Sequence, residues 1–175
     1  MKNSFNIYGK IIDGNNTDHY FMRFNKLSNN VIIYHLIGLL DGNKEKDLKE
    51  IKNIFKEEVD HIFFASSDCL EQFVDALGGI KINGNKINGA KALEEIRNNN
   101  FELVLSGIVN SLSGIRNPLF TIPGLLGALK GKCETDLNFT DVVKTVMLEA
   151  GDLKDWKAEL IEVNSENVNS IEVIN

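Results

Sequence analysis

The stretch Val31-Ile32-Ile33-Tyr34-His35-Leu36-Ile37 decides the fold of this chain. Its nearly continuous apolar character is typical of a central strand that is covered on both faces of a sheet. Two strands are predicted before it, at residues 5–12 and 19–24, because the apolar runs there are separated by the turn cluster Asp13-Gly14-Asn15-Asn16. A fourth strand is predicted at residues 60–65. These four strands are expected to share one central sheet.

Amphipathic segments between and after the strands predict helices. Leu48, Ile51, Ile54 and Phe55 fall at helical spacing among lysines and glutamates, which predicts a surface helix over residues 45–58. Further helices are predicted at residues 69–77, 90–97, 101–112, 124–130 and 142–150, with Ser66, Ser67 or Asp68 capping the first and Asn88 the second. Short strands are predicted at residues 80–82, 158–163 and 170–174. Strands mixed with helices in this way predict an α/β or α+β sandwich with a mixed sheet.

The composition is that of one globular domain, expected to span residues 1–175. The chain has 43% hydrophobic and 25% charged residues, which is close to the average for globular proteins. Its net charge of -6 gives no general attraction to the phosphate backbone, so nucleic acid is not an expected partner.

The two cysteines, Cys69 and Cys133, are too few and too far apart in sequence for a metal knuckle or a C-x-x-C redox pair. They are expected to be buried or half-buried thiols, and a disulfide between them requires a location outside the cytosol. The start of the chain does not resemble an export signal, and the longest apolar stretch, residues 31–40, is too short to cross a bilayer. Taken literally, the chain is expected to be soluble and unanchored.

Common catalytic motifs do not occur in the sequence. There is no Gly-x-Ser-x-Gly elbow and no Walker loop, because no lysine followed by serine or threonine follows Gly78-Gly79 or Gly84 at the required spacing. His19, His35 and His61 fall at or near predicted strands, and each is expected to be a core or rim histidine in preference to a ligand or a base. The function therefore has to be sought in larger patterns.

Five blocks stand out along the chain: Phe5-Asn6-Ile7-Tyr8-Gly9, Thr17-Asp18-His19-Tyr20-Phe21-Met22, residues 60–64 with 73–82, residues 87–97, and residues 125–137 with Thr140-Asp141-Val142. They resemble the LytR-CpsA-Psr family and follow the family's order. Together they span about residues 4 to 155. The resemblance implies an α-β-α sandwich with a central mixed sheet flanked by helices.

The family transfers glycopolymers of the teichoic acid or capsule type from a polyprenyl-pyrophosphate carrier to peptidoglycan in the cell envelope of Gram-positive bacteria. Arginines bind the pyrophosphate, an aspartate holds Mg²⁺, and an apolar tunnel takes the prenyl chain. The resemblance implies that Asp18 is the metal-binding aspartate and Arg97 the catalytic arginine. It also implies an extracytoplasmic location, a polyprenyl-linked glycopolymer or other amphiphile as a partner, and peptidoglycan as the acceptor.

The chain departs from the family at most of its other polar positions. The arginine before the aspartate is replaced within Gly14-Asn15-Asn16, Pro-Arg-Asp after the third strand reads Ile37-Gly38-Leu39, and the arginine-rich loop after Arg97 reads Asn98-Asn99-Asn100. Each lost arginine contact to a phosphate is worth about 2 kcal/mol or more. The active site is therefore expected to be degenerate, with weak or lost phosphotransferase activity unless Lys10 or Arg23 replaces the lost groups.

Alternatives remain open at this stage. Asp18 also fits a strand-start aspartate that bonds the backbone, and Arg97 fits a helix-end arginine favoured by the helix dipole. Without catalysis, the domain is expected to be a lipid- or amphiphile-binding module or a protein-interaction module. The apolar residues that correspond to the family's lipid cavity lie at Val31–Ile37, Phe63, Phe73 and 101–112, and these residues fit an ordinary packed core equally well.

Overall fold

The structure is a computed structural model, and it describes residues 4–25, 27–98, 100–113, 127, 129, 131–136 and 157–171. The strands of the main sheet are β1 (Ser4–Asp13), β2 (Asn16–Asn25), β3 (Asn30–Leu36), β4 (His61–Ser66), β7 (Cys133–Thr135) and β8 (Lys157–Val163). The helices are α1 (Lys44–Phe55), α2 (Ser67–Ala76), α3 (Gly89–Arg97) and α4 (Phe101–Ser113). A small hairpin of β5 (Ile80–Ile82) and β6 (Asn85–Ile87) connects α2 to α3, and a 3-10 helix forms at Val168–Ser170.

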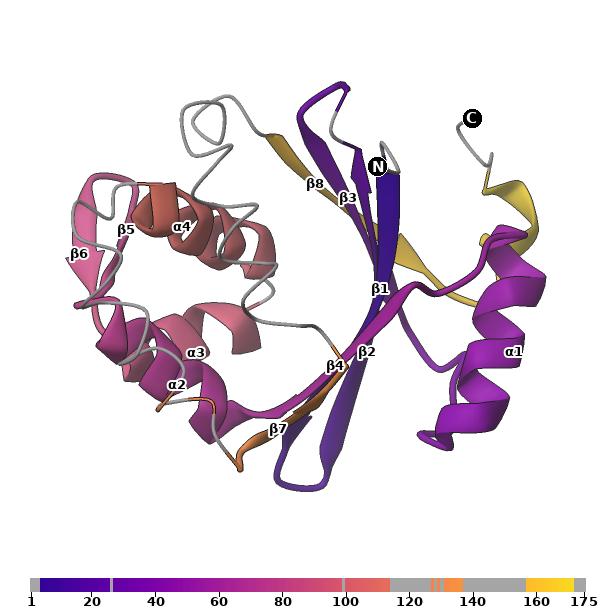
Figure 1. Cartoon of the computed structure of the whole chain (residues 1–175), viewed down its shortest axis with the longest axis horizontal. Helices are drawn as coiled ribbons and strands as arrows, with labels where there is room; N and C mark the ends of the chain where they lie inside the picture. The colour runs from indigo at the N-terminus through magenta and orange to yellow at the C-terminus, as the bar shows by residue number, and fades with distance from the viewer. Residues whose placement is uncertain are drawn as a thin grey trace.

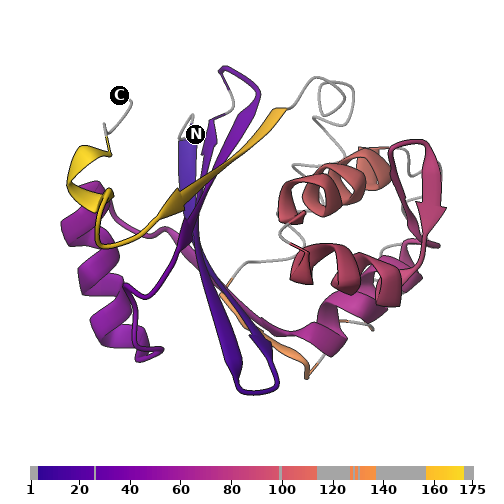
Figure 2. The same ribbon diagram turned by 180° about the vertical axis from the view of Figure 1, so that it is seen from behind.

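The six-stranded sheet has the order β7-β4-β1-β2-β3-β8 and is mixed. The pairs β1–β4 and β3–β8 are parallel, whereas β1–β2, β2–β3 and β4–β7 are antiparallel. Helix α1 lies on one face of the sheet and α2, α3 and α4 lie on the other (Figure 1), and the view from behind shows the same three layers (Figure 2). The predicted α-β-α sandwich with a central mixed sheet is confirmed.

The β1–β2 hairpin sets which side chains meet on the α1 face. Gly14 turns the chain with a φ of 61°, and the register pairs Asn6 with Arg23, Tyr8 with Phe21, and Lys10 with His19. Directly opposite residues point to the same face of a sheet, and alternate residues along a strand share a face. Tyr8 and Phe21 pack with Ile51 and Phe55 of α1, so all three cross-strand pairs face α1.

The helices on the other face have an apolar core of their own, which does not include the sheet. Its buried residues come from α2, α3, α4 and the small hairpin: Val74, Ile80, Ile82, Ala92, Val104 and Ile108. Helices α2 and α3 approach very closely, since a Cβ at Gly89 would collide with the main-chain carbonyl of Glu71. Two smaller clusters join this helical layer to the sheet, one around Tyr20 and Ile33 beneath α4 and one around Ala65 and Cys69.

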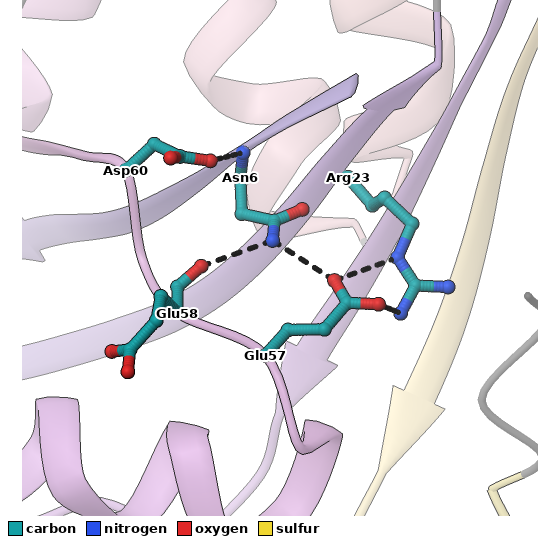
Figure 3. A network of polar contacts seen from close by, with 5 residues as sticks. All are labelled: Asn6, Arg23, Glu57, Glu58 and Asp60. Carbon is teal, nitrogen blue, oxygen red and sulfur yellow. Dashed lines mark hydrogen bonds and ion pairs between the residues drawn. The ribbon is translucent and has the colours of Figure 1, made fainter. Parts of the chain in front are cut away.

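A polar network, which we call the latch, fixes the chain after α1 to the sheet (Figure 3). Arg23 Nε donates to Glu57 Oε2 at 3.2 Å, and Nη2 donates to the other oxygen of the same carboxylate. Asn6 Nδ2 donates to Glu57 Oε2 at 2.9 Å and to the Glu58 carbonyl at 3.0 Å. The main-chain N–H of Asn6 donates to Asp60 Oδ2 at 3.0 Å. Arg23 is buried, so this ion pair is not an ordinary surface contact.

Most of the predicted elements are present, with shifted ends. The strands expected at 5–12, 19–24, 31–37, 60–65, 80–82 and 158–163 are confirmed, as are the caps at Ser66 and Asn88. The helix expected at 45–58 ends at Phe55, because Lys56 takes a left-handed conformation with a φ of 56° and donates its amide to the Lys52 carbonyl.

A few predictions differ from the structure or fall outside its described part. Strands β6 and β7 were not predicted, because Asn85-Lys86-Ile87 and Cys133-Glu134-Thr135 lack the apolar-polar-apolar alternation of Ile80-Lys81-Ile82. The strand expected at 170–174 is wrong at Ser170, where a 3-10 helix ends; residues 172–174 lie outside the described residues. The helix at 142–150 also lies outside them, and of the helix at 124–130 only residues 127 and 129 are described, both helical. Within the described part, no helix has both the length and the apolar character needed to cross a membrane.

Candidate functional site

A cleft of about 410 Å³ opens where β3 separates from β2. The cross-strand pairs of β2 and β3 end at Tyr20 and His35, and beyond this point Ile37 instead donates its amide to the Val163 carbonyl of β8. Among the described residues, the start of β2 thus has no strand partner on this side. The cleft is lined by Asn15, Thr17, Asp18, His19, His35, Leu36, Ile37, Gly38, Leu40, Asp41, Gly42 and Glu162.

The described lining of this cleft is acidic. It contains the carboxylates of Asp18, Asp41 and Glu162 and the imidazoles of His19 and His35, and it contains no lysine or arginine. Lys46 Nζ lies 3.3 Å from Asp41 Oδ2, but both side chains are exposed. A cleft of this composition does not attract a polyanion by its own charge.

Asp18 lies on the α4 face of β2 and contacts His35. The Asp18 Oδ1 atom is 3.3 Å from His35 Nε2, and the Asp18 side chain is 43% exposed. His35 stacks on Tyr20, with ring centroids 4.8 Å apart, and Tyr20 stacks on Phe101 at 4.5 Å. This column of rings connects the cleft to the first residue of α4.

A second polar chain, which we call the relay, enters the cleft from the α1 face. The Tyr8 hydroxyl donates to Asp47 Oδ2 at 2.7 Å and lies 2.8 Å from His19 Nδ1. Because the single hydroxyl proton goes to Asp47, His19 Nδ1 must donate to Tyr8, and its Nε2 is left as an acceptor. All three residues are buried, and His19 also lines the cleft.

Burial dominates the electrostatics of this relay. It lowers the pKa of His19 below its ordinary value, although Asp47 acts in the opposite direction. Burial and the hydrogen bond to Asp47 together raise the pKa of the Tyr8 hydroxyl far above its ordinary value. At neutral pH the relay therefore holds a neutral imidazole and a protonated phenol.

The relay also supports one wall of the cleft. Asp47 Oδ1 accepts the amide of Asp41 at 3.2 Å, so the buried carboxylate holds both Tyr8 and the segment before α1. In the same segment, Gly38 has a φ of 66°, in the left-handed region that disfavours other residues. An added Cβ at this position would meet no other atom within 4 Å, so a side chain here would strain the backbone without a steric clash.

Arg97 lies at the end of α3, outside the described lining of the cleft. It makes two hydrogen bonds to Asp13, from Nε at 2.8 Å and from Nη2 at 3.0 Å, and its side chain is 59% exposed. The bond from Arg97, followed by one from Ser67, lowers the pKa of Asp13 below its ordinary value. Arg97 is thus engaged by a carboxylate and does not point freely into solvent.

The two predicted site residues lie near each other but are not in contact. Asp13 pairs with Asn16, which makes Asp18 its diagonal neighbour on the same face of the hairpin. Diagonal neighbours have Cα atoms roughly 7–8 Å apart. Arg97 would have to leave Asp13 to reach a group bound beside Asp18.

The other residues considered for phosphate or metal binding lie away from the described lining of the cleft. Lys10 Nζ lies over the Phe64 ring, 4.4 Å from its centroid, and Arg23 is held in the latch, so neither lines the cleft. No group of three or more His, Cys, Asp or Glu side chains is placed to hold a metal ion within the described ranges. Mg²⁺ keeps several waters and binds through one or two carboxylates plus phosphate oxygens, so Asp18 fits only as one ligand of a substrate-bound ion.

The relay is the part of the site that the sequence did not predict. The register of the β1–β2 hairpin follows from its turn, and it would have placed Tyr8 and His19 on one face. A second signal was present in α1, where Asp47 occupies the same stripe as Ile51 and Phe55 at a spacing of four. An acid in an apolar stripe requires a buried partner.

Several solved structures of known proteins have a similar fold. The structure of TagV from B. subtilis superposes with a TM-score of 0.70 at 14% identity, over 97% of this chain and 95% of that one. TagT bound to LI-WTA gives a TM-score of 0.65 at 13% identity, over 93% and 79%. A transcriptional regulator from Enterococcus faecalis gives 0.71 at 15% identity, over 91% and 76%.

The sequence itself matches no family model and no curated protein. The chain has a LytR-CpsA-Psr-like fold, as the five sequence blocks predicted. At identities of 13–15%, this similarity establishes the architecture alone.

Proposed function

We propose that residues 1–175 form a single LytR-CpsA-Psr-like domain of the cell envelope, related to glycopolymer transfer but with weak or lost catalysis. The substrate class is a polyprenyl-pyrophosphate-linked glycopolymer of the teichoic acid or capsule type, with peptidoglycan as the acceptor. Asp18 would hold one Mg²⁺ ion and Arg97 would contact the pyrophosphate. An extracytoplasmic location is part of the same proposal.

The observation that carries this proposal is the charge of the cleft. The fold is shared with TagT bound to LI-WTA, yet the described lining has three carboxylates and no guanidinium. The segment that would supply arginine and aspartate instead supplies Ile37 and Gly38. Losing several charge-assisted contacts of about 2 kcal/mol each lowers transition-state binding by several powers of ten.

Arg97 and its partner Asp13 provide a sharp test of pyrophosphate binding. Titration of the full chain with a short-chain polyprenyl pyrophosphate in Mg²⁺ should give weak binding that Arg97→Gln abolishes. Asp13→Asn should strengthen binding, because it removes the carboxylate that competes for Arg97. Equal affinity for all three proteins would exclude Arg97 as a phosphate ligand.

The metal and the catalysis are tested separately. Removing Mg²⁺ with EDTA and replacing Asp18 with Asn should each weaken pyrophosphate binding, with little further loss when both are applied. Transfer of a carrier-linked saccharide to peptidoglycan fragments should be at least about 100-fold slower than for a relative with its arginines present. Comparable turnover would contradict the proposal that the active site is degenerate.

A second candidate function is amphiphile binding without transfer, and it rests on the α4 face of the sheet. Val31 and Ile33 of β3 form a buried cluster with Tyr20, and Phe101 and Leu105 of α4 pack against it. Phe63 and Phe73 pack in the separate cluster around Cys69. Ile32, Tyr34 and Leu36 face α1 instead, so only alternate residues of the strand are placed to line a lipid cavity.

Calorimetric titration with polyprenyl phosphate, polyprenol and a fatty acid distinguishes the two functions. Binding of all three without a requirement for Mg²⁺ supports an apolar site, since each square ångström of covered apolar surface gives roughly 25 cal/mol. Binding of the phosphate alone, with Mg²⁺, supports the transferase. Binding of none would leave a packed core and a role in protein interaction.

A further inference from the structure

The only two cysteines of the sequence, Cys69 and Cys133, pack in one cluster of the folded chain, although they are 64 positions apart. Cys69 lies in the first turn of α2, where its amide donates to Ser66 Oγ at 3.3 Å. Cys133 is the first residue of β7 and the cross-strand partner of Ala65, the residue before that cap. Cys133 packs against the buried cluster that contains Cys69 and Ala65, and both thiols are free.

The two cysteines lie at the place where the helical layer joins the main sheet. The chain leaves the main sheet at the end of β4, forms α2, the β5–β6 hairpin, α3 and α4, and returns to pair with β4 through β7 (Figure 1). Cys69 and Cys133 therefore lie at the two ends of this excursion. We call this place the neck of the helical layer.

The two thiols differ in their accessibility. Cys69 is 1% exposed and belongs to a buried cluster with Ala65 and Leu129, whereas Cys133 packs against the edge of that cluster and is half-buried. Cys133 Sγ donates to the Leu129 carbonyl at 3.4 Å. Burial raises the pKa of Cys69 to about 11 and also raises that of Cys133, so both thiols are protonated at neutral pH.

We propose that Cys69 and Cys133 are a redox-active pair that closes to a disulfide across the neck and fixes the helical layer to the sheet. The oxidant is a low-molecular-weight disulfide of the glutathione type. This inference concerns the scaffold and does not depend on what the cleft binds. Thiol–disulfide exchange requires one accessible thiol to attack and a second within reach to resolve, and the neck supplies both.

The exchange is balanced in two steps. The Cys133 thiolate attacks one sulfur of oxidised glutathione, the sulfur–sulfur bond breaks, and the departing glutathione thiolate takes up a proton. Cys69 then loses its proton and attacks the Cys133 sulfur of the mixed disulfide, which forms the Cys69–Cys133 bond and releases the second glutathione. The dithiol loses two electrons and oxidised glutathione gains them.

A redox titration of the full chain tests the proposal. The folded protein and the protein in urea are each equilibrated with mixtures of reduced and oxidised glutathione at pH 8. Each sample is then quenched with acid and alkylated, and its mass is measured by mass spectrometry. The effective concentration of the pair should be at least about 100-fold higher in the folded chain, because the fold packs the two cysteines in one cluster. Equal values in the two states would overturn the proposal.

Single variants separate the attacking thiol from the resolving one. Cys69→Ala should accumulate a mixed disulfide between Cys133 and glutathione, whereas Cys133→Ala should react at least about 10-fold more slowly because Cys69 is buried. A matched control moves the thiol by one residue: in Cys133→Ala with Glu134→Cys, the new side chain points to the opposite face of β7. That control should form no internal disulfide. An internal disulfide in the control would show that closure across the neck does not depend on a thiol at position 133.

The consequence for the fold has its own readout. Closing a loop of this length should raise Tm by about 10 °C, and a reductant should reverse the increase. Peptide mapping of the oxidised monomer should yield one linked peptide pair that contains both cysteines. A product that is only doubly glutathionylated, or only a disulfide-linked dimer, would contradict closure across the neck.

Discussion

The latch and the relay both begin on the α1 face of the β1–β2 hairpin, but they end differently. In the latch, the buried Arg23 is paired with Glu57 and the network closes on the chain that follows α1. In the relay, the hydrogen bonds run from Asp47 through Tyr8 to His19, which reaches the cleft. The first network ends on a protein group and the second ends at a surface that can meet a ligand.

This difference separates a structural role from a candidate functional one. A closed network contributes only to the folded state, so breaking it costs stability and changes nothing else. A network that ends at a cleft contributes to stability and also sets the protonation and position of a side chain there. Even the latch carries a cost, because Asn6 Oδ1 is buried and has no hydrogen-bond partner in the part of the chain that the structure describes.

The largest expected effect comes from breaking the latch. Arg23→Met leaves Glu57 without its buried partner and should lower the free energy of unfolding by about 3 kcal/mol, measured by urea denaturation. The double variant Arg23→Met with Glu57→Gln should recover part of this loss, since it removes the uncompensated charge. A loss below about 1 kcal/mol would show that the latch is no more than a surface ion pair.

The next effect comes from cutting the relay in the middle. Tyr8→Phe removes the hydroxyl between Asp47 and His19 and should cost about 2 kcal/mol, because two buried groups lose a hydrogen bond. Tyr34→Phe is the matched control, since Tyr34 is equally buried on the same face and its hydroxyl takes no part in the relay. Similar losses in both variants would mean that packing, and not the relay, is being measured.

The pH dependence of stability tests the end of the relay. The pKa of folded His19 lies below its ordinary value of 6.5, so the unfolded chain binds more protons as the pH falls below about 7. Stability should therefore decrease with falling pH by up to about 1 kcal/mol per pH unit, until His19 is protonated in the folded chain as well. Urea titrations between pH 7.5 and about 5 measure this slope.

A variant identifies the source of that slope. His19→Asn keeps a donor near Nδ1 but does not titrate, so the slope should become shallower. The charged groups that act on His19 are Asp47, Lys10, Asp18 and His35, and they are unchanged in this variant. An unchanged slope would assign the pH dependence to one of the other titratable groups.

The smallest expected effect is at the open side of the cleft. Asp18→Asn should change the free energy of unfolding by less than about 0.5 kcal/mol, because the carboxylate is 43% exposed and lies 3.3 Å from His35. The same variant is the one expected to weaken Mg²⁺-dependent binding. A loss of stability as large as that of Tyr8→Phe would instead make Asp18 part of the fold.

Much of the architecture was predictable because it depends on local patterns. The continuous apolar run at Val31–Ile37, the turn at Gly14 and the caps at Ser66 and Asn88 are all decided within a few residues. Strands β6 and β7 were missed because, unlike Ile80-Lys81-Ile82, they show no alternation of apolar and polar residues and are strands only through pairing with a partner. The position of Asp18 at the cleft follows from strand order, but its contact with His35 does not.

The sequence by itself determined the α/β class, the alternation of strands and capped helices, and the absence of arginine from residues 14–16, 37–39 and 98–100, because periodicity and residue identity are written along the chain. Only the tertiary structure decided that Tyr8 meets both Asp47 and His19, that Arg97 is engaged by Asp13, and that Cys133 packs in the cluster of Cys69. These contacts join residues 11 to 84 positions apart. The geometry of these contacts depends on how the helices pack on the sheet. No local sequence pattern determines how residues so far apart in the chain are placed in space.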